Sequence, residues 1–180
     1  MVVIGIGGRS CSGKSTIAGR FKEEHQEKTE LINQDMFFKI RADSWETTDA
    51  IRFDMMIEAI NLLRSGKSCM VPSKKNSEMA DSEIRPNEII LVEGYLLYVN
   101  LELNNLIDKR IWISVSDTNI LERRIRRDGS DRNKNYIVNE VIPISKRYCK
   151  EQKEKADAIF DGNVPDSSYG EVKNYIESII

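Results

Sequence analysis

The residues most able to do chemistry lie near the start of the chain, in a glycine-rich segment. Gly8 to Ser15 fits the pattern G-x-x-x-x-G-K-[ST] at every fixed position. Its two glycines allow the chain to turn so that successive backbone N–H groups point inward at a polyphosphate. Lys14 would add positive charge near the β and γ oxygens, and the Ser15 hydroxyl can ligate Mg²⁺. The segment therefore predicts a loop that binds a nucleotide through its phosphates.

The flanking sequence supports this interpretation over an ordinary glycine-rich turn. A short apolar run over 2–7 precedes the loop, as a buried parallel strand would. A helix expected over 16–21 follows it and would turn its positive end toward the same anion. The residues predicted to bind the nucleotide here are Gly8, Ser10, Cys11, Ser12, Gly13, Lys14, Ser15 and Thr16. Cys11 could be reactive, although a small residue that fills the loop is the simpler interpretation.

Two acidic residues end later apolar segments. Asp35 follows the run over 30–34, and Glu93 ends the run over 88–93. Since the carboxyl ends of parallel strands line the ligand crevice of an α/β sheet, both should lie beside the loop. Asp35 could accept a proton from an attacking hydroxyl, and Ser15, Asp35 and Glu93 are the predicted Mg²⁺ ligands. The alternatives are a helix N-cap for Asp35 and a solvated strand end for Glu93.

A third group of charged residues is basic. Its members are Arg123, Arg124, Arg126, Arg127 and Arg132. Like charges three or four apart on a helix repel by about 0.2–0.5 kcal/mol per pair, so an anionic partner should offset them. In a phosphoryl-transfer enzyme this segment would be an arginine-rich lid over about 117–135 that closes on the polyphosphate. A solvated basic helix face and a nucleic-acid patch are the alternatives, and the lack of interleaved aromatic residues weighs against the second.

Strand-like and helix-like patterns alternate along the chain, which indicates an α/β fold. The expected strands cover 2–7, 30–34, 88–93, 110–115 and 157–160. Helical spacing predicts further helices at 51–63, at 117–127 with Ser116 or Asp117 as the cap, at about 134–154 and at about 168–180. Gly66 should cap the first of these, and Pro143 should kink or break the third. Residues 67–87 are irregular, and we interpret them as a short surface hairpin.

Composition bounds the class of protein. The chain has 180 residues, of which 40% are hydrophobic and 31% charged, with a net charge of −2. These values predict one domain over 1–180 with a full core and no overall attraction to nucleic acid or to a membrane surface. The three cysteines are widely spaced and suggest neither a metal site nor a disulfide framework. No apolar stretch is long enough for a membrane span and no signal peptide is evident, so we expect a cytoplasmic protein.

Together these motifs resemble the uridine kinase and nicotinamide riboside kinase group of P-loop kinases. The motifs are Gly8–Thr16, Gln34-Asp35-x-Phe37-Phe38, Trp45-Glu46-x-x-Asp49-Ala50, Glu93-Gly94, Arg123-Arg124-x-x-Arg127-Asp128, Tyr136, Pro143 and Lys155–Phe160. The resemblance extends from the first strand to about residue 163. The phosphate loop alone is generic to nucleotide binders, whereas the combination is fairly specific.

The resemblance implies a three-layer P-loop kinase fold with a five-stranded parallel sheet in the order 2-3-1-4-5. It implies that ATP phosphorylates the 5′-hydroxyl of a nucleoside or related riboside. Asp35 would be the catalytic base, and Lys14, Arg123, Arg124 and Arg127 would clamp the phosphates. The adenine of ATP would lie near the turn that contains Asp161 and Gly162. The riboside would contact Asp35, Phe38, Glu46, Glu93, Arg127, Arg132 and Tyr136.

Two departures from that group concern the acceptor. Glu46 stands where relatives usually have an aspartate that binds the ribose hydroxyls. The stretch Val71–Ser77 lacks the Tyr and His with which uridine kinases read the pyrimidine, and the only histidine, His25, should be exposed at the end of the first helix. The acceptor could therefore be uridine, nicotinamide riboside or another small molecule.

Several alternatives stay open at this level. The chain could be a nucleotide-dependent regulatory binder that phosphorylates nothing, or an inactive relative that binds nucleic acid through its arginines. ATP rather than GTP as donor, and Mg²⁺ as metal, follow from the resemblance. A homo-oligomer is compatible with such folds, and we expect neither a nucleic acid nor a membrane as partner.

Overall fold

The computed structural model describes residues 1–73, 79–128 and 134–180. Its strands are β1 (Val2–Gly8), β2 (Thr29–Asn33), β3 (Cys69–Val71), β4 (Ser82–Ile84), β5 (Ile89–Gly94), β6 (Lys109–Ser114) and β7 (Ala158–Asp161). Its α-helices are α1 (Lys14–Glu24), α2 (Phe53–Arg64), α3 (Leu101–Asn105), α4 (Asp117–Asp128), α5 (Lys134–Tyr136), α6 (Ile142–Glu154) and α7 (Pro165–Ile179). Shorter helical turns are η1 (Gln34–Phe37), η2 (Thr48–Ala50) and the π-helical η4 (Ile137–Val141).

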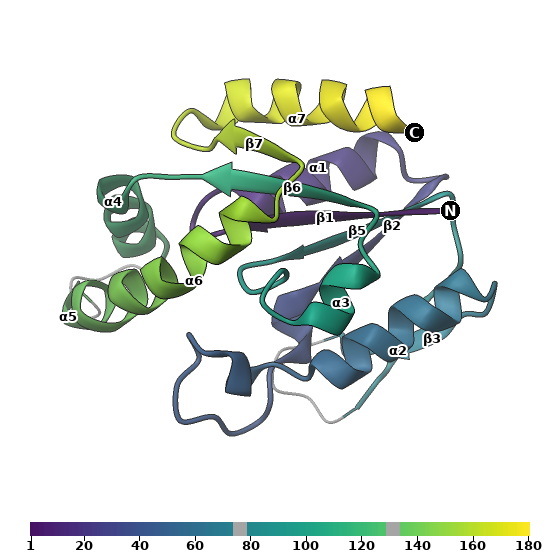
Figure 1. The fold of residues 1–180 in the computed structure, drawn as a ribbon, viewed down its shortest axis with the longest axis horizontal. Helices are drawn as coiled ribbons and strands as arrows, with labels where there is room; N and C mark the ends of the chain where they lie inside the picture. Colours follow the sequence, from purple (N-terminus) through teal and green to yellow (C-terminus); the bar gives the residue numbers. More distant parts are fainter. Residues whose placement is uncertain (74–78, 129–133) are drawn as a thin grey trace.

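The main sheet has five parallel strands in the order β2-β5-β1-β6-β7 (Figure 1). Numbered along the chain without the hairpin strands, this is the predicted order 2-3-1-4-5. Each of these strands begins and ends within one residue of its predicted bounds. The apolar runs were informative because both faces of a parallel sheet are covered, which leaves few polar positions inside the strands.

Helices cover both faces of the sheet and form the outer two of three layers. Figure 1 shows α1 and α7 on one face and α2 and α3 on the other. Alternate residues of β1 point to opposite faces of the sheet. Ile4 and Ile6 pack with Phe21 of α1 and Val172 of α7, whereas Val3 packs on the side of α2. This two-sided burial is the core that holds the strand ends in place.

The irregular stretch 67–87 contains the antiparallel pair of β3 and β4, which stands apart from the main sheet. Cys69, Val71 and Ile84 turn inward and join the apolar cluster that includes residues of α2. Residues 74–78 lie outside the described part of the chain. The hairpin is therefore attached to the α2 side of the molecule through its alternate apolar positions.

Local capping signals mark the end of α2 and the start of α4. Gly66 has φ +79°, and the Lys67 N–H donates to the Leu62 carbonyl at 3.0 Å, so the predicted C-cap of α2 is confirmed. The start of that helix was predicted two residues too early, because Ile51 instead bridges to Phe38. At α4 the Ser116 hydroxyl accepts from the Asn119 N–H at 3.2 Å and so caps the helix.

The predicted break at Pro143 is confirmed. Proline lacks an N–H and its ring crowds the carbonyl four residues earlier, so a regular helix cannot continue through it. The chain adopts the π-helical turn η4 directly before α6, in which Pro143 is the second residue. A further proline, Pro165, begins α7 three residues before its predicted start, as proline favours the first helical position.

Two peripheral features differ from the sequence-based predictions: the partial burial of His25 and the presence of helix α3. His25 is not exposed: its ring lies 4.3 Å from that of Phe21, and its Nε2 is 3.3 Å from Glu177. The short helix α3 was not predicted, although Asn100 caps it by accepting from the Leu103 N–H. Both features depend on packing with distant segments, which a local pattern does not reveal.

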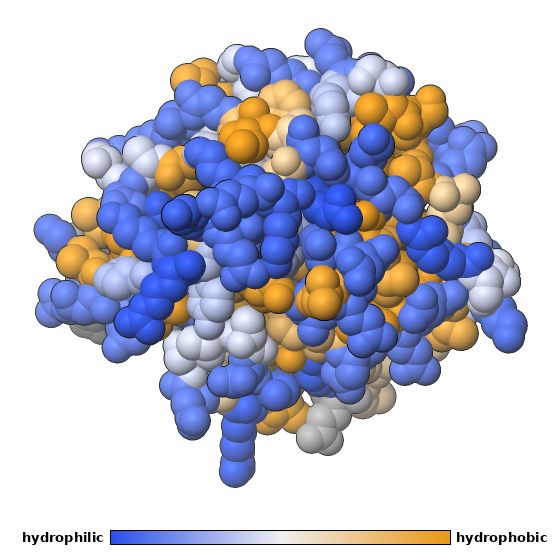
Figure 2. Space-filling view, viewed as in Figure 1, coloured by the Kyte–Doolittle hydropathy of each residue, from blue (hydrophilic) through white to orange (hydrophobic). Residues whose placement is uncertain are grey.

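The molecular surface is largely hydrophilic on the face drawn in Figure 2, with hydrophobic residues in scattered groups. None of the helices in the described residues is both long and apolar enough to span a bilayer.

Candidate active site

A cavity of about 780 Å³ opens where the strands of the main sheet end. It is lined by residues 10–17 and Arg20, by Asp35, Phe38, Trp45, Glu46 and Tyr95, by Arg123, Arg124, Arg127 and Tyr136, and by Pro165, Ser168 and Tyr169. The phosphate loop, the first predicted acid and the arginine cluster therefore meet around one space, although they come from distant parts of the sequence.

The phosphate loop has the backbone geometry of an anion site. Gly13 is the N-cap of α1 with φ +98°, and Cys11 also has a positive φ of 58°. The Ile17 N–H donates to the Gly13 carbonyl at 3.0 Å as the first bond of the helix. The N–H groups before it have no partner inside the helix, and the cap residue Gly13 has no side chain that could accept from them. With Lys14 beside them, these donors can bind a phosphate group at the wall of the cavity.

Two predicted loop contacts act by close packing and do not line the cavity. A Cβ on Gly8 would lie 2.5 Å from Ser12 Oγ and 2.9 Å from the Ile113 carbonyl. A Cβ on Gly162 would lie 2.6 Å from the Ser12 carbonyl. Both glycines therefore let neighbouring segments approach the back of the loop.

The two predicted acids reach the site in different ways. Glu93 is 1% exposed and accepts a 3.0 Å hydrogen bond from the Ser15 hydroxyl, which excludes the solvated strand end. Asp35 lines the cavity itself. It is not the cap of η1, because the Asn33 side chain accepts from the Asp35 N–H at 2.8 Å. Glu93 lies behind Ser15, while Asp35 faces the open space.

The turn that presents Asp35 is tied to the end of β5 through Gln34. The Gln34 Oε1 accepts from the Leu96 N–H at 3.0 Å. A Cβ on Gly94 would lie 2.5 Å from that oxygen, so only glycine allows this contact. The motifs Gln34-Asp35 and Glu93-Gly94 are therefore one structural unit.

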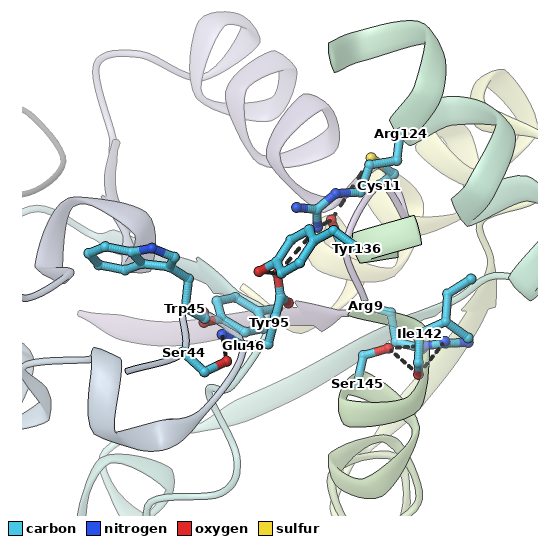
Figure 3. A network of polar contacts seen from close by, with 11 residues as sticks. Arg9, Cys11, Ser44, Trp45, Glu46, Tyr95, Arg124, Tyr136, Ile142 and Ser145 are labelled. Carbon is cyan, nitrogen blue, oxygen red and sulfur yellow. Dashed lines mark hydrogen bonds and ion pairs between the residues drawn. The ribbon is translucent and has the colours of Figure 1, made fainter. Parts of the chain in front are cut away.

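Arg124 joins three parts of the site (Figure 3). Its side chain is 14% exposed, and its Nη1 donates to Ser10 Oγ at 3.0 Å and lies 3.5 Å from Glu46 Oε1. The Tyr136 hydroxyl donates to the same Glu46 oxygen at 3.3 Å. Burial, together with the Glu46 carboxylate, raises the pKa of Tyr136. The anion that offsets this arginine inside the protein is therefore Glu46.

Arg123 is engaged with main-chain carbonyls. Its guanidinium donates to the Cys11 carbonyl at 3.2 Å and to the Gly162 and Asn163 carbonyls at 2.8 Å each. The Asp161 carboxylate accepts from the Asn163 N–H at 2.9 Å and shapes that turn. Arg123 thus connects the phosphate loop to the turn predicted to lie near adenine. Arg127, also on α4, is exposed at the cavity.

Arg132 and the segment 129–133 of the expected lid lie outside the described residues.

The cavity has an aromatic half that the motifs only partly indicated. The Phe38 ring lies 5.5 Å from Trp45 in an edge arrangement and 6.1 Å from Tyr95 in a stacked one. The Tyr95 hydroxyl donates to the Trp45 carbonyl, and burial raises the pKa of Tyr95. Tyr95 was not predicted, although its place directly after Glu93-Gly94 was a usable signal.

The sequence motifs did not predict the residues at the opposite end of the cavity, where Arg20 and Tyr169 lie. The Arg20 guanidinium lies 3.9 Å from the centre of the Tyr169 ring, where α1 meets α7. Pro165 and Ser168 line the same end. Arg20 and Tyr169 are far apart in the sequence and match no motif, so only the packing of the two helices reveals them.

Comparison with known proteins agrees with the geometry. Residues 3–168 match the model of the phosphoribulokinase / uridine kinase family. A uridine kinase of Chlamydia pneumoniae is 29% identical to the chain, over all of this chain and 92% of the relative.

Among solved structures, a possible uridine kinase from Bacillus stearothermophilus has a TM-score of 0.56 at 17% identity, covering 89% of this chain and 88% of that one. A shikimate kinase from Acinetobacter baumannii has a TM-score of 0.62 at 13% identity, covering 100% of this chain and 96% of that one. These two likenesses concern the fold alone, whereas the family match covers most of the sequence. The chain has the predicted α/β P-loop kinase fold and belongs to the phosphoribulokinase / uridine kinase family.

Proposed function

We propose that the protein transfers a phosphoryl group from ATP to the 5′-hydroxyl of a nucleoside or related riboside, with Mg²⁺. The observation that carries this proposal is that Asp35 and the phosphate loop line one cavity whose other wall is aromatic. Its volume of about 780 Å³ suits ligands of this size, since small-molecule sites span roughly 300–1,000 Å³.

The donor end is suited to a polyphosphate with its metal. The loop N–H groups and Lys14 supply positive charge, and the Ser15 hydroxyl beside the Glu93 carboxylate supplies oxygen ligands. This small donor set fits Mg²⁺, which keeps several waters and binds through one or two side chains plus phosphates. Mg²⁺ bound there would offset charge between the phosphate groups.

The transfer itself would depend on position and charge. Asp35 would orient the acceptor hydroxyl and accept its proton late in the transfer. Lys14, Arg124 and Arg127 would stabilise the negative charge that spreads over the transferred group. Each of these four side chains lines the same cavity.

The acceptor end supports a ring with hydroxyl groups. Glu46 is 7% exposed and would exchange part of its contact with Tyr136 for ribose hydroxyls. Phe38, Trp45, Tyr95 and Tyr136 would pack against a planar base. In the described part of the hairpin, no residue lines the cavity. An aromatic wall does not distinguish a pyrimidine from a pyridine, so nicotinamide riboside is the second candidate after uridine.

The proposal is tested by ADP release from ATP and Mg²⁺ with a panel of acceptors. The panel contains uridine, cytidine, adenosine, nicotinamide riboside, pantothenate and free sugars. We expect acceptor-dependent release with one class of riboside, and its loss in Lys14→Ala. Tight ATP binding without release for any acceptor would contradict the proposal and favour a regulatory nucleotide binder.

A further inference from the structure

The phosphate loop contains an arginine that its motif does not require. Arg9 is 7% exposed, and its guanidinium donates to Asp117 Oδ1 at 2.6 Å, to Ser145 Oγ at 3.0 Å and to the Ile142 carbonyl at 3.4 Å. Figure 3 shows it pointing away from the cavity, toward Ile142 and Ser145 at the start of α6. A buried guanidinium is costly unless its donors are satisfied, so this set of contacts holds Arg9 in one position.

Three consecutive loop residues are each bonded to α4. The contacts are Arg9 with Asp117, Ser10 with Arg124, and Cys11 with Arg123. Asp117 is the first residue of the helix, and the two arginines follow about 9–11 Å along its axis, at 1.5 Å per residue. The loop therefore holds α4 at two separated points. The contact with Asp117 fixes the beginning of the helix, and the other two lie beside the cavity.

The contact with Asp117 is reinforced from α6. Lys146 Nζ lies 2.5 Å from Asp117 Oδ2, and Ser145 is 7% exposed. Burial alone would raise the pKa of Asp117, but hydrogen bonds from Lys146 and Arg9 outweigh it and lower that pKa. Asp117 is therefore ionised at neutral pH and joins the loop, α4 and α6.

We propose that Arg9 is a positioning residue for phosphoryl transfer, which fixes α4 against the phosphate loop so that Arg124 faces the phosphate end of the cavity. The inference rests on the proposed function, because Arg124 matters for rate only if phosphoryl transfer occurs in this cavity. Arg9 itself does not line the cavity. Its loss should therefore act through Arg124 and leave the loop's own contacts with nucleotide in place.

The first test compares Arg9→Met with a matched control, Arg110→Met. Arg110 donates to the same kinds of group, the Asn104 side chain and carbonyl and the Asp157 carboxylate, but it does not line the cavity or contact the loop. We expect kcat of Arg9→Met to fall about 10–100-fold, since small displacements of a catalytic group have effects of this size. The KM for ATP should stay within about 3-fold, as expected when the lost interaction forms only in the transition state. Arg110→Met should keep kcat.

A double variant separates positioning from general destabilisation. If Arg9 acts through Arg124, then adding Arg124→Ala to Arg9→Met should lower kcat by much less than Arg124→Ala does alone. The proposal would be overturned if the fold-losses in kcat of the two single variants multiplied in the double variant. A wild-type kcat in Arg9→Met would also overturn it. Should Arg9→Met fail to fold, Arg9→Lys keeps the charge and loses the forked geometry, and it should show the same non-additivity at a smaller loss.

Hydrogen exchange tests the positioning without any acceptor. Arg9→Met should speed amide exchange over 117–128, while Arg110→Met should leave that segment as in the wild type. Equal exchange over 117–128 in Arg9→Met and wild type would overturn the proposal. If the wild type shows no riboside-dependent ADP release, the proposed function fails, and the exchange data still decide whether Arg9 fixes α4.

Discussion

The Ser15 hydroxyl donates a 3.0 Å hydrogen bond to the Glu93 carboxylate, which joins the first turn of α1 to the end of β5. In the sheet, Glu93 pairs with Ile6 on one side and Asn33 on the other. The carboxylate is therefore held by a strand that has a neighbour on each side, and it is 1% exposed. A hydroxyl and a carboxylate in this fixed relation form an oxygen site prepared for a hard cation.

Glu93→Gln should remove the charge of this site while keeping the size of the side chain. We expect Mg²⁺-dependent activity to fall about 10–100-fold, the effect usual for a residue that supports a metal site. ATP affinity measured in EDTA should change little, because the loop N–H groups and Lys14 remain. Titrations of activity against Mg²⁺ check this. Glu30→Gln is the control, since Glu30 lies on β2 but pairs with Lys22 outside the cavity.

Asp35→Ala should separate chemistry from nucleotide binding. The residue lines the cavity, so we expect kcat to fall by about 10²–10⁴, the usual contribution of a general base. ATP affinity by calorimetry should be retained. The control is Asp54→Ala, at an exposed position on α2, which should keep the wild-type kcat and the wild-type ATP affinity. Phosphoryl transfer at the wild-type rate in Asp35→Ala would show that another group accepts the proton.

Gly94→Ala should disturb Asp35 without touching it. The new Cβ would lie 2.5 Å from Gln34 Oε1, so Gln34 must leave its hydrogen bond to Leu96 and shift the turn that carries Asp35. We expect a loss of about 1–3 kcal/mol in unfolding free energy, as for other overpacked sites. We also expect a lower kcat.

Gly19→Ala is the matched control for Gly94→Ala. A Cβ on Gly19 meets nothing within 4 Å inside helix α1. This change should therefore stabilise the protein by about 0.5–1 kcal/mol, and kcat should not change. Denaturant unfolding and steady-state kinetics compare the pair. Equal stability of the two variants would contradict the steric argument.

The sheet and the acids at its edge could be predicted because their signals are local. A strand buried on both faces is an apolar run, and the carboxyl ends of parallel strands share one edge. The positions of Asp35 and Glu93 follow from these two facts alone. The exact surroundings of these acids could not be predicted from the same facts. Strand β2 ends at Asn33, and the Asn33 side chain, not that of Asp35, caps the turn η1.

The partners of the arginines could not be predicted in the same way. Charge repulsion along α4 indicated that anions should offset its arginines, yet nothing in the spacing identified Glu46 as the partner of Arg124. Arg9 occupies a position that the loop motif leaves free, so its contact with Asp117 depends on how α4 crosses the loop. The Arg20 and Tyr169 pair depends likewise on the packing of α1 against α7.

The packing of α1 against α7 should also depend on pH through Glu24. Glu24 lies 2.6 Å from Lys173. The hydrogen bond from Lys173 is the main cause that lowers the pKa of Glu24 from 4.5 to about 2. Because the folded state favours the charged carboxylate, Glu24 stabilises the protein above pH 4.5, and this stabilisation is lost as pH falls from 4.5 toward 2.

Glu24→Gln should therefore lower the midpoint of denaturant unfolding at pH 7, and the difference from wild type should shrink steadily below pH 4.5. In a Lys173→Met background the substitution should have a much smaller effect at pH 7, because the main partner of the carboxylate is gone. Unfolding curves for the four proteins of this cycle, from pH 7 to pH 3, measure both effects. A difference that stays constant with pH would mean that Glu24 acts through packing and not through its charge.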